Sequence, residues 1–135
     1  KKWRLWRDAG RGDDLWAFVE DDLERVIEAG LSVIPARCRL REVVESVVSA
    51  WRRGVGWDEV VGLMVSKLHS YHPVHTIPNA AIVAASLRWG EGDYTSSIAM
   101  AVSCGLDTDC NCATVGSIIG VMKGYKGLGD QVRKT

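Results

Sequence analysis

The 135-residue sequence lacks a surplus of either charge, a supply of prolines and a long apolar run. Lys and Arg number 17 and Asp and Glu also number 17, so the basic surplus that nucleic-acid-binding proteins direct at phosphates is absent. Only three prolines occur, and neither Asn-Gly nor Asp-Gly is present, which argues against an all-β fold. No segment reaches the roughly 18 consecutive apolar residues of a membrane span. We therefore expect one globular domain that binds neither nucleic acid nor membrane.

A secretion signal is not evident either. Residues 1–7 are basic, but no apolar stretch of signal-peptide length follows them, so we expect a cytoplasmic protein. The four cysteines are Cys38, Cys104, Cys110 and Cys112. A chain of this length can build a core without disulfide bonds, so free thiols are expected.

Helical periodicity is the strongest pattern that the sequence contains. Apolar residues recur at three- and four-residue spacing over residues 40–51 and 57–68, which predicts two amphipathic helices. A similar pattern over residues 15–27 predicts an earlier helix, broken near Asp21 and Asp22 and ending before Gly30.

Three segments in the second half, residues 80–87, 94–104 and 113–122, are apolar on every side rather than along one stripe. Such helices belong in the middle of a fold. Asp93 is a candidate N-cap for the second of them, and Gly105 is expected to end it. The last segment carries a stripe of small residues, which we expect to let another helix backbone come close: Gly116, Gly120 and Gly124. The pattern as a whole predicts an all-α fold, an orthogonal helical bundle.

The number of fully apolar helices creates a problem of cover. Three helices that must be buried on all sides expose more apolar surface than the amphipathic helices can cover. We therefore predict that the chain either self-associates, most simply as a homodimer, or belongs to a larger domain.

The stretch most suggestive of chemistry is residues 105–111 (GLDTDCN), between two apolar segments. Asp107 and Asp109 place two carboxylates at the start of a helix, which is costly unless a cation or hydrogen-bond donors compensate them. Carboxylate oxygens are ligands that Mg²⁺ and Ca²⁺ accept, so one interpretation is a divalent-cation site beside the loop that contains His75 and Asn79. The alternative is that Asp109 caps the helix and Asp107 is simply solvated.

A second group consists of His69, His72 and His75, which together with the cysteines could bind a soft metal ion. The spacing is poor for such a site, because no Cys-x-x-Cys pair occurs and Cys110 and Cys112 would point to different sides of a helix. Structural hydrogen bonds are the favoured role for the histidines.

Several segments resemble one known family. Residues 75–81 (HTIPNAA), 90–94 (GEGDY) and 105–120 (GLDTDCNCATVGSIIG) closely resemble the C-terminal half of the ADP-ribosylglycohydrolases. Residues 26–37 (VIEAGLSVIPAR) are similar to the middle of bacterial members. The resemblance covers about residues 21–135, in the order found in the family, and leaves the Trp- and Arg-rich residues 1–20 unplaced.

The resemblance implies an all-α enzyme that binds two Mg²⁺ or Mn²⁺ ions and hydrolyses the bond between ADP-ribose and an acceptor, so ADP-ribose or an ADP-ribosylated substrate is the expected partner. One metal half-site of that family is an Asp-x-Asp followed by a hydroxyl residue. Asp107 and Asp109 match this half-site, and Cys110 stands where the hydroxyl residue is expected, although a thiol is a poor ligand for a hard ion. The resemblance assigns no catalytic residue, and it points to three substrate-binding candidates, Gly105, His75 and Asn79.

The other half-site of that family, a Thr-Asp-Asp, has no counterpart in the sequence. Its nearest imitation is Gly12-Asp13-Asp14, which fits a helix start better. We therefore expect a truncated form with one metal half-site and little or no hydrolase activity by itself. The competing hypothesis is a non-catalytic helical binding module that self-associates.

Overall fold

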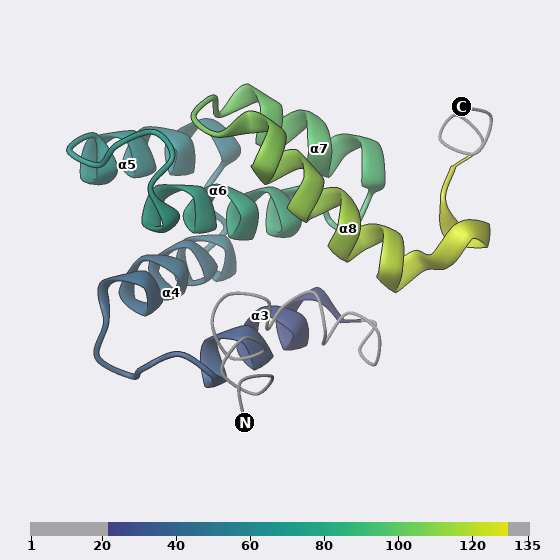
Figure 1. Cartoon of the computed structure of the whole chain (residues 1–135), viewed down its shortest axis with the longest axis horizontal. Coiled ribbons are helices and arrows are strands. Elements are labelled where there is room, and N and C mark those ends of the chain that lie inside the picture. The colour runs from purple at the N-terminus through teal and green to yellow at the C-terminus, as the bar shows by residue number, and fades with distance from the viewer. Residues whose placement is uncertain (1–21, 130–135) are drawn as a thin grey trace.

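The computed structural model describes residues 22–129, which form six α-helices (Figure 1). These are α3 (Leu23–Ser32), α4 (Arg39–Arg52), α5 (Trp57–Leu68), α6 (Thr76–Trp89), α7 (Tyr94–Ser103) and α8 (Thr108–Gly127). No strand occurs among residues 22–129, so the all-α prediction is confirmed. None of the described helices combines the length and the apolarity that a membrane crossing requires.

The amphipathic helices α4 and α5 lie where the periodicity predicts them. α4 buries Val44, Val47, Val48 and Ala50, and α5 buries Val60, Met64 and Leu68. Most of these side chains join a hydrophobic core cluster with residues of α6. The N-cap of α4 is Cys38, whose sulfur accepts a hydrogen bond from the Arg41 N–H at 3.4 Å.

Helix α3 ends later than the sequence predicts. The expected end before Gly30 is wrong, because the helix continues past this residue. Leu31 packs against the core cluster of α4, α5 and α6, and this tertiary contact offsets the helix penalty of Gly30, about 1 kcal/mol. Asp22, beside the predicted break, is the N-cap of α3. Residues 15–21 of the expected earlier helix lie outside the described residues.

Helix α6 is the centre of the fold. It packs against each of the other five described helices, and Figure 1 shows it between α4 on one side and α7 and α8 on the other. Its side chains are buried around the helix, with Ala81, Ala85 and Leu87 at most 1% exposed. The prediction of an all-round buried helix is confirmed for this segment.

The same prediction is wrong for α7 and α8, which lie at the periphery. α7 fully buries only Ser97 and Ala101, and its Val102 is 53% exposed. α8 buries a face that includes Val115 and Ile118, while Ser117 is exposed. Both helices pack against α6, so within the described residues the chain itself supplies much of the cover that the sequence pattern calls for.

The glycine stripe of α8 receives a side chain rather than a helix backbone. A Cβ built on Gly116 would lie 3.3 Å from the Tyr94 hydroxyl of α7. Gly124 has a φ of +60° and interrupts the helix. The close backbone approach occurs at Gly90 instead, where a Cβ would lie 2.7 Å from the Ser97 Cα, so any side chain there would collide with α7.

An ion pair connects α3 to the C-terminal end of α6. Arg88 is only 7% exposed; its guanidinium stacks 3.6 Å from the centre of the Trp51 ring, and its Nη2 lies 3.3 Å from the Glu24 carboxylate. Arg52 of α4 donates from Nε to the same carboxylate at 2.7 Å, and this hydrogen bond raises the pKa of Arg52. Glu24 therefore holds α3 against both α4 and α6.

Candidate functional site

The turn between α7 and α8 sets the position of the candidate ligands. Gly105 follows α7 with a φ of +71°, which confirms that this glycine closes the helix. Leu106 is also left-handed, with a φ of +60°, a conformation that residues other than glycine seldom adopt. These two residues turn the chain so that Asp107 occupies the N-cap position of α8.

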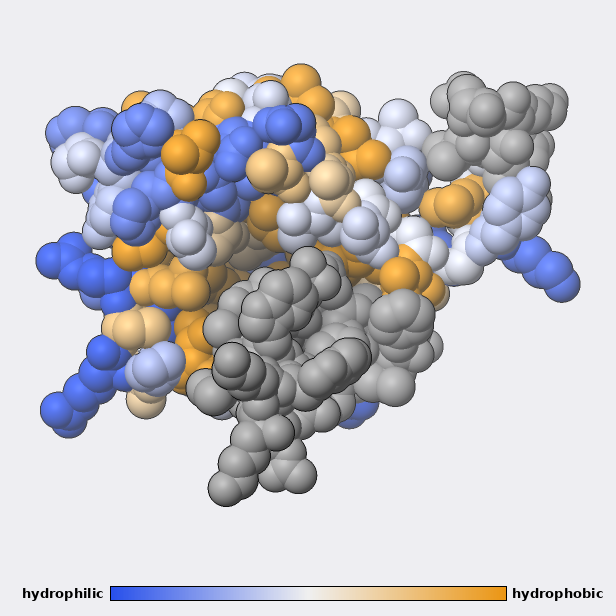
Figure 2. Space-filling view, viewed as in Figure 1, coloured by the Kyte–Doolittle hydropathy of each residue, from blue (hydrophilic) through white to orange (hydrophobic). Residues whose placement is uncertain are grey.

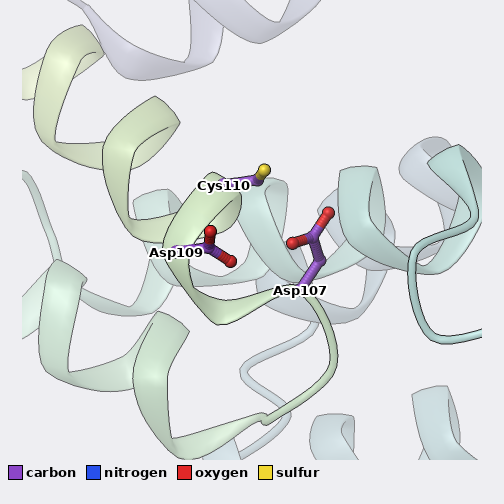
Figure 3. Close-up of side chains that lie close together, drawn as sticks. All are labelled: Asp107, Asp109 and Cys110. Atoms are coloured by element: carbon purple, nitrogen blue, oxygen red, sulfur yellow. The ribbon is translucent and has the colours of Figure 1, made fainter.

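Asp107, Asp109 and Cys110 lie around a common space at the start of α8 (Figure 3). One ligand atom from each residue lies within 4.8 Å of those of the other two. The residue at the N-cap is Asp107, so the alternative in which Asp109 caps the helix is wrong. Asp107 makes no side-chain hydrogen bond to the helix N–H groups, which leaves its carboxylate turned toward the cluster.

The electrostatics of the cluster favour a cation. The Asp107 carboxylate accepts a hydrogen bond from the Cys110 thiol, and this bond together with the negative charges of Asp107 and Asp109 raises the pKa of Cys110. The thiol is therefore protonated at neutral pH when no cation is present. The N-terminal end of α8 relieves part of the repulsion between the carboxylates, and a divalent ion placed among the three groups would relieve far more.

Asn79, in the first turn of α6, ties the start of α8 to α6. Its Nδ2 donates to the carbonyl oxygens of Pro73 at 2.7 Å and His75 at 2.9 Å. Its Oδ1 accepts from the Asn111 Nδ2 at 2.8 Å and from the Asp107 N–H at 3.4 Å. The expected position of Asp107 beside this loop is confirmed. Because the whole hydrogen-bonding capacity of the amide is used within the protein, Asn79 positions Asp107.

A cavity of about 340 Å³ opens beside the cluster. One face of α8 lines it with Asp107, Cys110, Asn111 and Thr114, which follow one another at helical spacing. The opposite walls are apolar and come from α3, α4 and α6, with Ile27, Leu31, Leu40, Val44, Val83 and Leu87. A molecule in this cavity would meet polar groups at the α8 end and hydrocarbon elsewhere.

Two of the three predicted substrate-binding residues do not line the cavity. His75 is the N-cap of α6, and its Nδ1 accepts a hydrogen bond from the Ile77 N–H at 3.2 Å. Gly105 shapes the turn before Asp107. Only Asn79 of the three lines the cavity.

The histidines do not form a metal site with the cysteines. The Nδ1 of His69 lies 2.9 Å from the Ser66 carbonyl oxygen, and the Nδ1 of His72 accepts from the Val74 N–H at 3.3 Å. Among residues 22–129, the only group of three side chains placed to share an ion is the cluster at the start of α8. Residues 12–14, the imitation of a second half-site, lie outside the described part of the chain.

Asn111 and Thr114 also belong to the site, although the sequence did not single them out. Asn111 is only 2% exposed and holds the Asn79 amide, and Thr114 lines the cavity one turn further along. Their spacing could have identified them, because both residues share a helical face with Asp107. Polar residues that recur in this way along an otherwise apolar helix indicate a site.

Comparison with known proteins gave one family. A family model described as ADP-ribosylglycohydrolase matches residues 6–135 of the chain. The match includes the cluster at the start of α8 and begins inside residues 1–20, the segment that the sequence analysis left unplaced. Searches of curated proteins and of solved structures gave no match.

Proposed function

Because the chain belongs to the ADP-ribosylglycohydrolase family, we propose that Asp107, Asp109 and Cys110 form one half of a divalent-metal site that serves the hydrolysis of ADP-ribose linkages. The observation that carries this proposal is the convergence of three ligand atoms beside a cavity. Two carboxylates suit Mg²⁺ or Mn²⁺. Such an ion, when bound, supplies an activated water and polarises the bond to be broken.

The chain's own residues divide the work of holding the ion and the substrate. Asp107 and Asp109 provide oxygen ligands, and Asn79 fixes the backbone of Asp107 through its Oδ1. The cavity of about 340 Å³ lies in the usual range for small-ligand pockets, about 300 to 1,000 Å³, and its apolar walls suit a base or a sugar face.

These residues alone have little or no hydrolase activity under this proposal. Within residues 22–129 no second cluster of three ligands accompanies the first, so a second ion would need ligands from elsewhere. Hydrolysis depends on precise placement, and an error of about 1 Å can cost roughly 100-fold in rate.

The deciding experiment combines a turnover assay with metal binding. Release of ADP-ribose is measured from an ADP-ribosylated protein and from O-acetyl-ADP-ribose, with Mg²⁺ or Mn²⁺ present, and Mn²⁺ binding is measured by calorimetry. We expect no turnover, and weak Mn²⁺ binding that is lost in Asp107→Asn. Asp58→Asn is the matched control, since Asp58 also lies in the first turn of a helix but outside the cluster, and it should leave binding unchanged.

The possible failures point to different errors. Absence of Mn²⁺ binding would refute a half-site for hard ions such as Mg²⁺ and Mn²⁺. Turnover that disappears in Asp107→Asn and Asp109→Asn would refute the predicted lack of activity and show that the chain is an active hydrolase. Turnover that survives both substitutions would come from a contaminant.

A second candidate function is a non-catalytic module that self-associates as a homodimer. An apolar groove of about 280 Å³ between α5, α6 and the α7–α8 turn favours it, because Val65 and Leu106 beside the groove are 63% and 47% exposed. Hydrophobic residues also reach the surface in Figure 2. Sedimentation at micromolar concentration should then give a dimer that Val65→Lys dissociates. A 14.8 kDa monomer for the unmodified chain would refute it.

The proposed location is the cytoplasm. All four cysteines are free thiols, which agrees with a reducing compartment. Cell fractionation tests this, with the protein expected in the cytoplasmic fraction.

A further inference from the structure

The donor set of the cluster does not fit a site specific for a hard cation. Asp107 and Asp109 offer carboxylate oxygens, which accept Mg²⁺, Ca²⁺ or Mn²⁺. The third donor, the Cys110 sulfur, is a poor ligand for Mg²⁺ and Ca²⁺ but a good one for Zn²⁺ and Co²⁺. A site built for Mg²⁺ would be expected to place an oxygen at this position.

Local packing or capping explains the presence of a cysteine at three positions, but not at position 110. Cys38 caps α4, Cys104 is half-buried against the core, and Cys112 directs its sulfur toward a carbonyl oxygen of α7. Cys110 is exposed and belongs to no core cluster. Its sulfur lies within 4.8 Å of a carboxylate oxygen of Asp107, and the residue lines the cavity.

We propose that this cluster binds a thiophilic divalent ion such as Zn²⁺ or Co²⁺ in preference to Mg²⁺, with the Cys110 sulfur as the ligand that sets the preference. The inference rests on the proposed metal half-site. Bonds of about 2.0 to 2.3 Å place two ligands of one ion at most about 4.6 Å apart. Atoms that lie within 4.8 Å of one another therefore reach a common ion by small side-chain rotations. When the metal–sulfur bond forms, the thiol proton passes to solvent.

Spectroscopy of the Co²⁺-loaded 135-residue chain tests the proposal directly. A sulfur bound to Co²⁺ gives a charge-transfer band in the near ultraviolet, and an indicator dye measures the released proton. We expect both signals in the unmodified chain and neither in Cys110→Ser. Affinity for Co²⁺ should fall about 10-fold or more in this variant, while affinity for Mg²⁺ should not fall.

Two further variants keep the experiment interpretable. Cys112→Ser is the matched control, because it removes a neighbouring thiol that faces α7, and it should retain the band. Cys110→Thr should bind Mg²⁺ at least as well as the unmodified chain, because a hydroxyl oxygen suits that ion better. Circular dichroism should show the same helix content in all three variants.

The outcomes separate this inference from the proposed function. Binding of Co²⁺ and Mg²⁺ that is lost in Asp107→Asn but unchanged in Cys110→Ser, with no band, overturns the preference and leaves the half-site standing. A band that persists in Cys110→Ser and disappears in Cys112→Ser places the sulfur elsewhere and also overturns the preference. Binding of neither ion overturns both proposals.

Discussion

Replacing Asn79 with alanine removes the side chain that joins the start of α8 to α6. The substitution deletes the hydrogen bond that the Asn111 Nδ2 donates at 2.8 Å, and Asn111 is only 2% exposed, so water cannot readily replace the lost partner. A buried donor left in this way costs about 1 to 3 kcal/mol. The carbonyl oxygens of Pro73 and His75 lose a partner as well, so we expect Asn79→Ala to lower the free energy of unfolding by about 2 to 4 kcal/mol.

Urea denaturation followed by circular dichroism measures this loss. With a typical dependence of about 1 to 3 kcal/mol per molar urea, the midpoint should fall by about 0.7 to 4 M. A double-mutant cycle with Asn111→Ala supplies the control, because the second substitution should cost about 1 kcal/mol less once Asn79 is gone. Asn79→Ala should also weaken Mn²⁺ binding, since it releases the Asp107 N–H.

Two results would refute this reasoning. A loss below about 0.5 kcal/mol would mean that water or a shifted side chain satisfies Asn111. Additive costs in the cycle would mean that Asn79 and Asn111 do not stabilise the fold through their mutual hydrogen bond.

Two other predictions concern charged residues outside the site. Glu24→Gln should lower the free energy of unfolding by about 1 to 2 kcal/mol, because buried Arg88 loses its charged partner and Glu24 is itself partly exposed. Glu28→Gln changes an exposed pair on the same helix and should cost less than about 0.5 kcal/mol in the same urea titration. The hydrogen bond from the Ser96 N–H lowers the pKa of Asp93, so its stabilisation is complete above the ordinary carboxyl pKa and is lost as the pH falls through the lowered value. The unmodified chain should therefore be more stable than Asp93→Ala near neutral pH and approach it in acid; a difference that is constant with pH would contradict this.

The helices could be predicted from the sequence where large apolar side chains mark one face. Valine, methionine and tryptophan in α4 and α5 do so, and their bounds are confirmed. In α7 the fully buried residues are Ser97 and Ala101, whereas the larger Val102 is 53% exposed, so side-chain size could not show which side of the helix faces α6. The end of α3 is predicted too early because Gly30 has a low helix propensity. The contact of Leu31 with the core cluster overrides that local preference.

The candidate ligands could be identified because they are neighbours in the chain. Asp107, Asp109 and Cys110 need only the turn before α8 to converge. The cavity and the link from Asn79 to Asn111 could not be predicted, because they join segments about 30 residues apart through side-chain contacts that no local pattern encodes. The family resemblance names Asn79 as a substrate-binding candidate, and its hydrogen bonds give it a role in positioning Asp107.

The closeness of the ligands along the chain also bears on what a bound ion can do for stability. An ion held within residues 107–110 would close a very short loop, and such a loop removes little conformational entropy from the unfolded chain. The unfolded segment would also keep the same donors near one another and could compete for the ion, which reduces the stabilisation of the folded state. Loading the site should therefore raise the melting temperature very little, so binding must be followed by spectroscopy or calorimetry and a flat thermal-shift curve would not show that the site is empty.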